Sequence, residues 1–289
     1  MKSASFDYHR PATLDEAAGL AASLEDAKIL AGGQSLVPMM NMRFVQPAHV
    51  IDINRVDELT RLEAANGSIR IGAMVRQSAL MQSQLVAREL PVMADALAHV
   101  GHFQTRNRGT IGGSLCHLDP AAELAAVAAL YDARVTVRRG ADSRVVPFAE
   151  WPLAYMTPSI APDEIATGIT FSPWPEKSGH AFVEFSRRHG DFAIVAVGAL
   201  VQLDRGAAVA RAALAVAGAD QVVRRLPDVE AALVGQKAEP ETFAEAARLA
   251  ATMETMDDAH VSAAYRRRLV AVLAERALAA AAARAGGEA

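Results

Sequence analysis

The sequence predicts an α+β protein of two domains. Its 289 residues are about twice the length of a common single domain. Short apolar runs typical of strands alternate with helical patterns along most of the chain, whereas the last third is mainly helical. Hydrophobic residues make up 52% of the chain and charged residues 21%, so the chain can bury a sizeable core.

The N-terminal part follows the order strand, helix, strand, glycine turn, strand. The helix is expected over residues 14–24, with Thr13 as its N-cap and a glutamate three residues later, as in a capping box. Residues 28–31 form a short apolar strand that leads into two glycines, and residues 50–53 form the next strand. We therefore expect a glycine turn directly at the end of a strand.

Strands and helices continue to alternate through the middle of the chain. A strand at residues 69–74 follows an Asn66-Gly67 turn, and another is expected at residues 134–138. Helices are expected over residues 77–85, 91–100 and 121–130. Residues 105–114 are rich in glycine, and we predict a loop there.

A proline-rich stretch marks the expected domain boundary. Five prolines lie between residues 152 and 175 with little periodicity. We place the boundary at their end, which gives a first domain over residues 1–177 and a second over residues 178–289. Strands are expected over residues 181–185, 194–203 and 210–217. Helices are expected over residues 227–233, 241–253 and 263–283.

The charge balance and the single cysteine exclude several classes of protein. The formal net charge is −4, without the basic face that nucleic-acid binding needs. No apolar run approaches the ~18 residues of a membrane span, and the first residues lack the apolar core of a signal peptide. Cys116 alone can form neither an internal disulfide nor an iron–sulfur site. We expect a cytoplasmic protein.

The first candidate binding segment directly follows the strand at residues 28–31. It reads Ala31-Gly32-Gly33-Gln34-Ser35-Leu36. Two adjacent glycines permit positive φ angles and remove side-chain bulk, so successive backbone N–H groups can point at one anion. Alone, such a pair is most often a plain tight turn. The segment is neither a Walker loop nor the dinucleotide fingerprint, because the spacing differs from both.

A second segment with the same chemistry lies further along the chain. It reads Thr110-Ile111-Gly112-Gly113-Ser114, and the helix expected at residues 121–130 could add a favourable dipole. Two such segments match the two phosphates of a pyrophosphate. Neither contains Lys or Arg. A site without cations favours a permanently held cofactor, bound through backbone amides, over a nucleotide substrate with a metal ion.

Four ordered motifs carry a resemblance to a known family. They are AGGQSL (31–36), RNRGTIGGS (106–114), SLCHLDPAAEL (114–124) and SRRHGDFAIVAV (186–197). Together they resemble the FAD-binding medium subunits of the xanthine dehydrogenase and carbon monoxide dehydrogenase family, the molybdenum hydroxylases. The resemblance covers nearly the whole chain, including the ending YRRRLVAVLAERAL (265–278).

The resemblance implies a fold and a set of FAD contacts. Residues 1–177 would form a two-lobed FAD-binding domain of the PCMH type, and residues 178–289 a carbon monoxide dehydrogenase flavoprotein-like C-terminal domain. The two glycine segments would hold the FAD pyrophosphate and the neighbouring ribose and ribityl groups. Glu123 resembles an acidic residue, usually Asp, that hydrogen-bonds a flavin or ribose hydroxyl. Ile165 resembles a residue whose backbone reaches the flavin ring.

The resemblance also implies a multi-subunit assembly. A large subunit would hold the molybdopterin cofactor and the substrate, and a small subunit would hold two [2Fe–2S] clusters. This chain would take electrons from those clusters and pass them from FAD to an external electron acceptor. A dimer of heterotrimers is the expected arrangement. We expect no catalytic side chain and no metal site in this chain, because the redox chemistry belongs to the cofactor.

Departures from the family pattern leave two alternatives open. Ser114 stands where many relatives have Asn, and Val183 stands where some have Lys, so we assign no cationic flavin contact there. The departures at Glu123 and Val183 permit a non-catalytic binder that kept the fold and lost FAD, although the intact glycine segments argue against it. A standalone flavin oxidase is the other alternative. Relatives of that kind often tether the flavin through His or Cys, and neither glycine segment contains one. The substrate and the electron acceptor stay open.

Several other residues have two interpretations. His99, His102 and His117 could form a metal cluster, but no carboxylate or cysteine completes a convincing ligand set. Phe182 could cover a flavin ring face or fill a strand core. The final helix could dock a partner subunit, although its apolar stripe is also what a core-facing helix needs.

Overall fold

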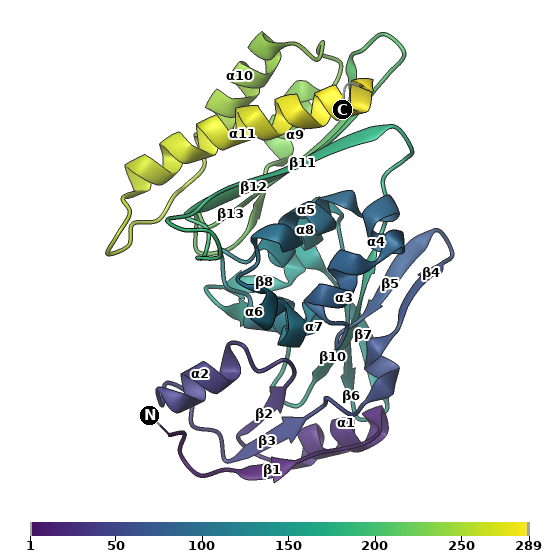
Figure 1. Ribbon diagram of the computed structural model, residues 1–289, viewed down its shortest axis with the longest axis vertical. Helices are drawn as coiled ribbons and strands as arrows, with labels where there is room; N and C mark the ends of the chain where they lie inside the picture. Colours follow the sequence, from purple (N-terminus) through teal and green to yellow (C-terminus); the bar gives the residue numbers. More distant parts are fainter. Residues whose placement is uncertain (1, 288–289) are drawn as a thin grey trace.

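Three regions follow one another along the long axis of the molecule (Figure 1). The computed structural model describes residues 2–287, so residue 1 and residues 288–289, at the outer ends of the two expected domains, lie outside it. The regions are a small N-terminal sheet with helices, a larger sheet with several short helices, and a C-terminal sheet covered by three helices.

The first region is a parallel three-stranded sheet with two helices. Its elements are β1 (Asp7–His9), α1 (Leu14–Ser23), β2 (Ala27–Leu30), α2 (Leu36–Asn41) and β3 (His49–Asp52). The strand order is β1, β3, β2. Thr13 caps α1, because its hydroxyl accepts a hydrogen bond from Glu16 N at 3.2 Å. The expected order of elements is confirmed, but α2, directly after the glycine turn, was not predicted.

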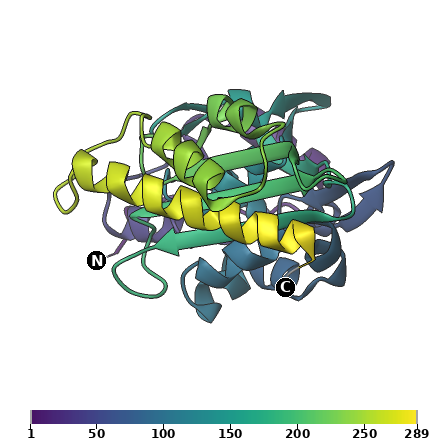
Figure 2. The same ribbon diagram turned by 90° about the horizontal axis from the view of Figure 1, so that it is seen from above.

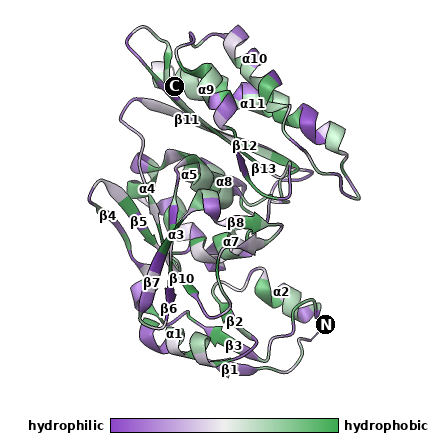
Figure 3. Ribbon diagram, turned by 180° about the vertical axis from the view of Figure 1, so that it is seen from behind, coloured by the Kyte–Doolittle hydropathy of each residue, from purple (hydrophilic) through white to green (hydrophobic). Residues whose placement is uncertain are grey.

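The second region is an antiparallel five-stranded sheet. The strands lie in the order β4 (Leu62–Ala65), β5 (Ser68–Gly72), β10 (Ile165–Phe171), β6 (Arg134–Arg139) and β7 (Asp142–Pro147). The central strand β10 comes from the proline-rich stretch, where no strand was predicted. The edge strand β7 and its neighbour β6 carry hydrophilic residues (Figure 3) alongside buried valines that face the core. Outside the sheet lie β8 (Pro152–Ala154) and β9 (Thr157–Pro158), and the 3-10 helices η1 (Asp57–Thr60) and η2 (Phe148–Glu150).

Six short helices pack beside this sheet. They are α3 (Gln77–Gln82), α4 (Gln84–Glu89), α5 (Pro91–His99), α6 (Phe103–Arg108), α7 (Ile111–His117) and α8 (Glu123–Leu130). The helix predicted over residues 77–85 is wrong in its extent. It ends before Ser83, whose hydroxyl caps a new helix by accepting from Val86 N.

The loop predicted at residues 105–114 is also wrong. Its first part lies in α6, and its last part opens α7. The Thr110 hydroxyl caps α7 by accepting a hydrogen bond from Gly113 N at 3.0 Å. The glycines lower the intrinsic helix propensity. Capping and the close packing of Gly112 on Ala73 override that preference.

The third region is an antiparallel sheet between two layers of helices. Its strands are β11 (Ser178–Phe185), β12 (Val195–Leu203), β13 (Val209–Ala217) and β14 (Arg224–Arg225), and its helices are α9 (Pro227–Leu233), α10 (Pro240–Ala250) and α11 (Ala263–Gly286). The predicted strands and helices of this region are confirmed. The three helices lie over one face of the sheet (Figure 2), while α5 and α8 contact the other.

The helix α8 is buried on almost every side. Seven of its eight residues are buried, which explains why its sequence lacks a polar face. Its neighbours are α5, α7 and the strands β12 and β13 of the third region. The second and third regions therefore share a continuous core. No helix within residues 2–287 has the length and apolar character that crossing a membrane requires.

Candidate cofactor site

The fold brings the two glycine segments into contact. The turn between β2 and α2 lies against the turn between α6 and α7, where the first region meets the second (Figure 1). A Cβ added to Gly113 would lie 3.6 Å from the Cβ of Ala31, and a Cβ added to Gly32 would overlap the carbonyl group of Arg108. The segments are about 80 residues apart in sequence, so tertiary packing alone creates this junction.

The first segment offers free backbone donors. Gly33 has a φ of +73°, which favours glycine. Within residues 2–287, the N–H groups of Gly32, Gly33, Gln34 and Ser35 donate no hydrogen bond to protein. The Gln34 side chain turns back and donates to the Gly32 carbonyl at 3.1 Å. Successive free N–H groups of this kind are the donors that an anion needs.

The second segment contributes space and hydroxyl groups rather than free amides. The N–H groups of Ile111 and Gly112 donate to Val75 and Ala73 carbonyls at 3.2 and 2.9 Å. Those of Gly113 and Ser114 donate to Thr110, at 3.0 Å to its hydroxyl and at 3.1 Å to its carbonyl. The prediction that these amides point at an anion is therefore wrong for residues 111–114. The hydroxyl groups of Thr110 and Ser114 remain as possible donors.

A cation lies at the junction, although neither segment contains one. Arg76 Nη1 donates to the Arg108 carbonyl, and Arg76 Nη2 donates to Asn54 Oδ1 at 2.5 Å. Asn54 Nδ2 in turn donates to the Ala31 carbonyl at 2.8 Å. Burial and the nearby Arg108 charge lower the Arg76 pKa, against the effect of Asp52, yet arginine stays protonated in proteins. The cation at the junction therefore comes from outside the two segments, neither of which contains Lys or Arg.

Sequence reasoning missed Arg76 and Asn54, but a signal for both exists. Asn54 follows the end of β3 by two residues, and Arg76 follows β5 by four. Polar residues just beyond strand ends frequently line binding sites, because the ends of neighbouring strands meet at one edge. Their contact with each other depends on the packing of the first region on the second, which no local pattern reports.

Glu123 is a buried carboxyl group at the start of α8. Its residue is 6% exposed, and burial raises its pKa to about 8, with a smaller contribution from the charges of Glu184 and Asp119. Burial also raises the pKa of Glu184 to about 7, and Glu184 Oε2 has no protein partner among the described residues. A protonated carboxyl group can donate a hydrogen bond to a hydroxyl group. The helix that Glu123 opens, α8, contacts α7, which contains residues 111–114 of the second segment.

The Ile165 side chain lies in a buried core cluster against which Ala31 of the first glycine segment packs. It is 1% exposed and packs in the core of the first region beside Ile51 and Met74. Its predicted backbone contact stays a prediction. Phe182 is buried, and its ring centroid lies 5.8 Å from that of His99, so the strand-core interpretation fits its position.

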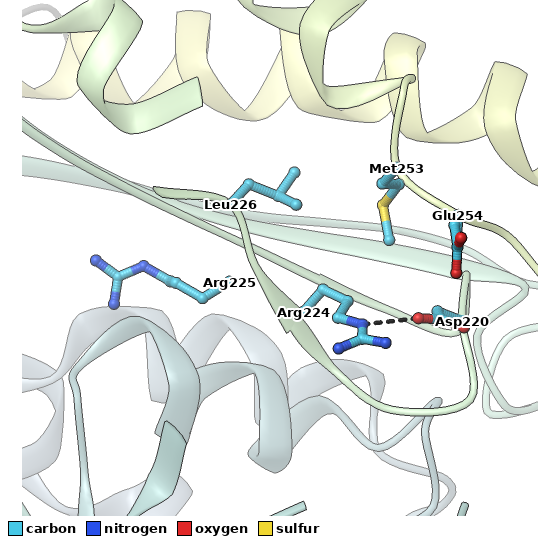
Figure 4. Close-up of a pocket in the computed structure, with 6 residues that line it drawn as sticks. All are labelled: Asp220, Arg224, Arg225, Leu226, Met253 and Glu254. Atoms are coloured by element: carbon cyan, nitrogen blue, oxygen red, sulfur yellow. Dashed lines mark hydrogen bonds and ion pairs between the residues drawn. The ribbon is translucent and has the colours of Figure 1, made fainter. Parts of the chain in front are cut away.

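The other candidate groups form no site. No set of His, Cys, Asp and Glu within residues 2–287 is arranged to hold a metal ion. Burial raises the pKa of Cys116 to about 12, which favours the protonated thiol over the thiolate at neutral pH. A pocket of about 220 Å³ in the third region is shown in Figure 4. Its Arg224 is already paired with Asp220 at 2.7 Å, so the pocket offers no free cation there.

The junction fits a bound pyrophosphate. The first segment contributes free amides, the second contributes hydroxyl groups, and the Arg76 guanidinium is bonded to the Arg108 carbonyl between them in space. A side chain at Gly32 would collide with the Arg108 carbonyl, so glycine at this position allows the close approach of the two segments. Gly112 instead allows the start of α7 to pack against Ala73. Backbone donors, hydroxyl groups and a nearby cation are the groups that recognise phosphate oxygens.

Comparisons with known proteins cover nearly the whole chain. Residues 4–174 match the family described as FAD binding domain in molybdopterin dehydrogenase, and residues 180–281 match that described as CO dehydrogenase flavoprotein C-terminal domain. Over 281 residues, 96% of this chain and 95% of the relative, the chain is 39% identical to the 6-hydroxypseudooxynicotine dehydrogenase complex subunit alpha of Paenarthrobacter nicotinovorans. Over 286 residues, 98% of this chain and 100% of the relative, it is 39% identical to the nicotine 6-hydroxylase medium subunit of that organism.

A solved structure has the same fold. A chain of the carbon monoxide dehydrogenase from Hydrogenophaga pseudoflava, in a form lacking the Mo-pyranopterin moiety of the molybdenum cofactor, superposes with a TM-score of 0.95. The two chains are 33% identical, and the match covers 98% of this chain and 99% of the other. The likeness therefore extends over all three regions.

Proposed function

Because this chain belongs to the family of FAD-binding medium subunits of the molybdenum hydroxylases, we propose that it holds FAD at the junction of its two glycine segments. The observation that carries this proposal is the contact between residues 31–35 and 108–114, with free amides on one side. The first segment would bind phosphate oxygens through its N–H groups. Thr110 and Ser114 would bind through their hydroxyl groups.

Two further groups are proposed to act on the rest of the cofactor. Glu123 would donate a hydrogen bond to a ribityl or ribose hydroxyl, which its raised pKa permits at neutral pH. The backbone of Ile165 would approach the ring from β10. When bound, FAD supplies the capacity to accept and release two electrons. The protein would bind, orient and shield it, with no side chain of this chain acting as acid or base.

We further propose the electron path and the assembly. The chain would take electrons from the [2Fe–2S] clusters of a small partner subunit and pass them from FAD to an external acceptor. A large molybdopterin subunit would bind and hydroxylate the substrate, and two heterotrimers would pair. The medium-chain names of the relatives support a multi-subunit complex. The division into domains at residue 177 remains a proposal, supported by the two matched ranges. A cytoplasmic location also remains a proposal, supported by the single cysteine, which can form no internal disulfide.

Purification of the chain with its native partners tests the proposal. We expect one FAD per chain by visible absorbance and mass spectrometry, together with partner chains that carry molybdenum and iron. A folded chain without flavin in that complex would refute FAD binding and favour the non-catalytic binder. A yellow chain that turns over a substrate alone would favour a standalone oxidase.

A further inference from the structure

A continuous chain of hydrogen bonds connects the backbones that lead into the two glycine segments. Asn54 Nδ2 donates to the Ala31 carbonyl at 2.8 Å, and Arg76 Nη2 donates to Asn54 Oδ1 at 2.5 Å. Arg76 Nη1 donates to the Arg108 carbonyl. Asn54 belongs to the first region and Arg76 to the second. The chain of bonds therefore crosses from one region to the other.

The last bond of this chain, from Arg76 to the Arg108 carbonyl, lies where the two segments are in contact. The Arg108 carbonyl lies so close to Gly32 that no Cβ fits between them. The same carbonyl accepts the hydrogen bond from Arg76. Any movement of the second segment away from the first would therefore stretch the Arg76 bonds. Glycine at position 32 permits the close approach, and the guanidinium holds it.

A buried carboxylate fixes the orientation of the Asn54 amide. Asp52 Oδ1 accepts from Asn54 N at 2.9 Å and from Asn54 Nδ2 at 2.5 Å, and Asp52 Oδ2 accepts from the Tyr8 hydroxyl. Burial acts to raise the Asp52 pKa, but the hydrogen bonds from Tyr8 and Asn54 outweigh burial and hold that pKa below its ordinary value. Asp52 therefore stays an acceptor, and Asn54 Oδ1 faces Arg76.

We propose that Arg76 is a positioning residue whose guanidinium fork holds the two glycine segments at the spacing that a pyrophosphate requires. This inference rests on the proposed FAD site. The fork is essential because its two nitrogens bond to two separate acceptors, on Asn54 and on Arg108. Lysine has one compact ammonium group and cannot reproduce this planar arrangement. Arg76 forms no ion pair with any residue in the 2–287 range, so its charge also remains available to the phosphates.

The test measures FAD affinity of the full-length chain after removal of its flavin. Arg76→Met and Arg76→Lys should each weaken FAD binding by about tenfold or more, because the charge-assisted bonds that hold the segments are lost. Asn54→Ala should weaken it similarly, because it breaks the same connection at another point. The double variant Arg76→Met/Asn54→Ala should bind FAD about as well as the weaker single variant. Arg70→Met, at an exposed arginine of the same region, is the matched control.

Comparison of FAD affinity with folding stability distinguishes a positioning role of Arg76 from a general loss of folding. Thermal unfolding of the flavin-free variants reports on folding, and Arg76→Lys and Asn54→Ala provide the comparison where Arg76→Met fails to fold. Three results would contradict the proposed role of the Arg76 guanidinium. They are wild-type FAD affinity in Arg76→Met, wild-type FAD affinity in Arg76→Lys, and a loss of FAD affinity in the double variant equal to the product of the two single losses. A wild-type chain that binds no FAD refutes the proposed function itself. A wild-type chain that binds FAD beside unaffected variants refutes only the role of Arg76.

Discussion

Gly112 shows how a single missing side chain positions the candidate site. It lies in the first turn of α7, and a Cβ there would be 2.5 Å from the Ala73 Cβ. Its N–H donates to the Ala73 carbonyl at 2.9 Å, so the helix start is held directly on the end of β5. At this residue the need for glycine is steric, because Gly112 has no positive φ.

We predict that Gly112→Ala weakens FAD binding and destabilises the chain by about 1–3 kcal/mol, the cost of overpacking a filled site. Gly19→Ala is the matched control, because Gly19 also lies in a helix but has no heavy atom near its Cβ position. It should stabilise the chain by about 0.5–1 kcal/mol. Thermal unfolding and FAD titration measure both effects. Equal behaviour of the two variants would contradict this account of Gly112.

Glu123 makes the stability of the flavin-free chain depend on pH. Its folded-state pKa of about 8 lies above the ordinary value of 4.5, so the folded chain keeps a proton that the unfolded chain releases. Stability should therefore fall as pH rises from about 4.5 to 8, by up to about 1.4 kcal/mol per pH unit. Glu184 acts in the same direction, with a pKa of about 7.

We predict that Glu123→Gln reduces this slope and raises the unfolding temperature above neutral pH. The neutral amide has no charge to desolvate, whereas the exposed Glu25→Gln control should leave the slope unchanged. Thermal unfolding of flavin-free protein across this pH range measures the effect. A Glu123→Gln variant with the wild-type slope would show that Glu123 ionises freely in the folded chain.

At the scale of elements, the C-terminal end of α8 is completed by the third region. Arg225 Nη1, at the end of β14, donates to the Ala129 and Leu130 carbonyls at 2.9 and 3.3 Å. The Ala129 carbonyl also accepts from Asp132 N at 3.3 Å, and the guanidinium adds a charged donor to both carbonyls from about 95 residues away. The same side chain pairs with Glu230 and with Asp132, at 2.9 Å to the latter. Helix α8 and the third region are therefore held as one unit.

We predict that Arg225→Met lowers the free energy of unfolding by about 1–3 kcal/mol, because buried carbonyls lose a charged donor. Arg205→Met, in an exposed turn of the same region, should change it by less than about 0.5 kcal/mol. Thermal unfolding with hydrogen exchange at α8 measures the difference. Unchanged exchange at residues 129–131 would rule out a capping role.

At the scale of the whole molecule, the candidate site lies between two regions rather than inside one. Only the first region carries residues 31–36, and only the second carries Arg76 and residues 110–114. The comparisons confirm the expected family and fold along the whole chain. A ligand at the junction contacts both regions, so its binding and the packing of the two regions should depend on each other.

We predict that removal of FAD lowers the unfolding temperature of the chain and that added FAD restores it. A ligand that binds only the folded state stabilises it by about 2.7 kcal/mol at a hundred times its dissociation constant. Hydrogen exchange should show FAD protecting residues 31–36 and 110–114, with α10 as the internal control in the third region. Protection confined to the third region would place the ligand elsewhere.

The sequence by itself determined the elements whose patterns are long and regular, and the residue types of the candidate site. Helices α1, α9, α10 and α11 and strands β12 and β13 all lie where periodicity predicted them, because local spacing alone creates their apolar faces. The two glycine pairs were recognisable because only glycine suits such positions. The glycines in residues 105–114 led to the prediction of a loop, whereas the Thr110 hydroxyl caps a helix that begins there.

Only the tertiary structure decided how these parts meet. Contact between Ala31 and Gly113 depends on how the first region packs on the second. The central strand β10 of the second sheet comes from within the proline-rich stretch, where local sequence predicted no strand. In the folded chain the N–H groups of residues 111–114 donate to other protein groups, and Arg76 lies next to the second segment through its bond to the Arg108 carbonyl. Hydrogen bonds and close contacts between distant residues arise from the arrangement of elements in space. Periodicity along the chain carries no record of that arrangement.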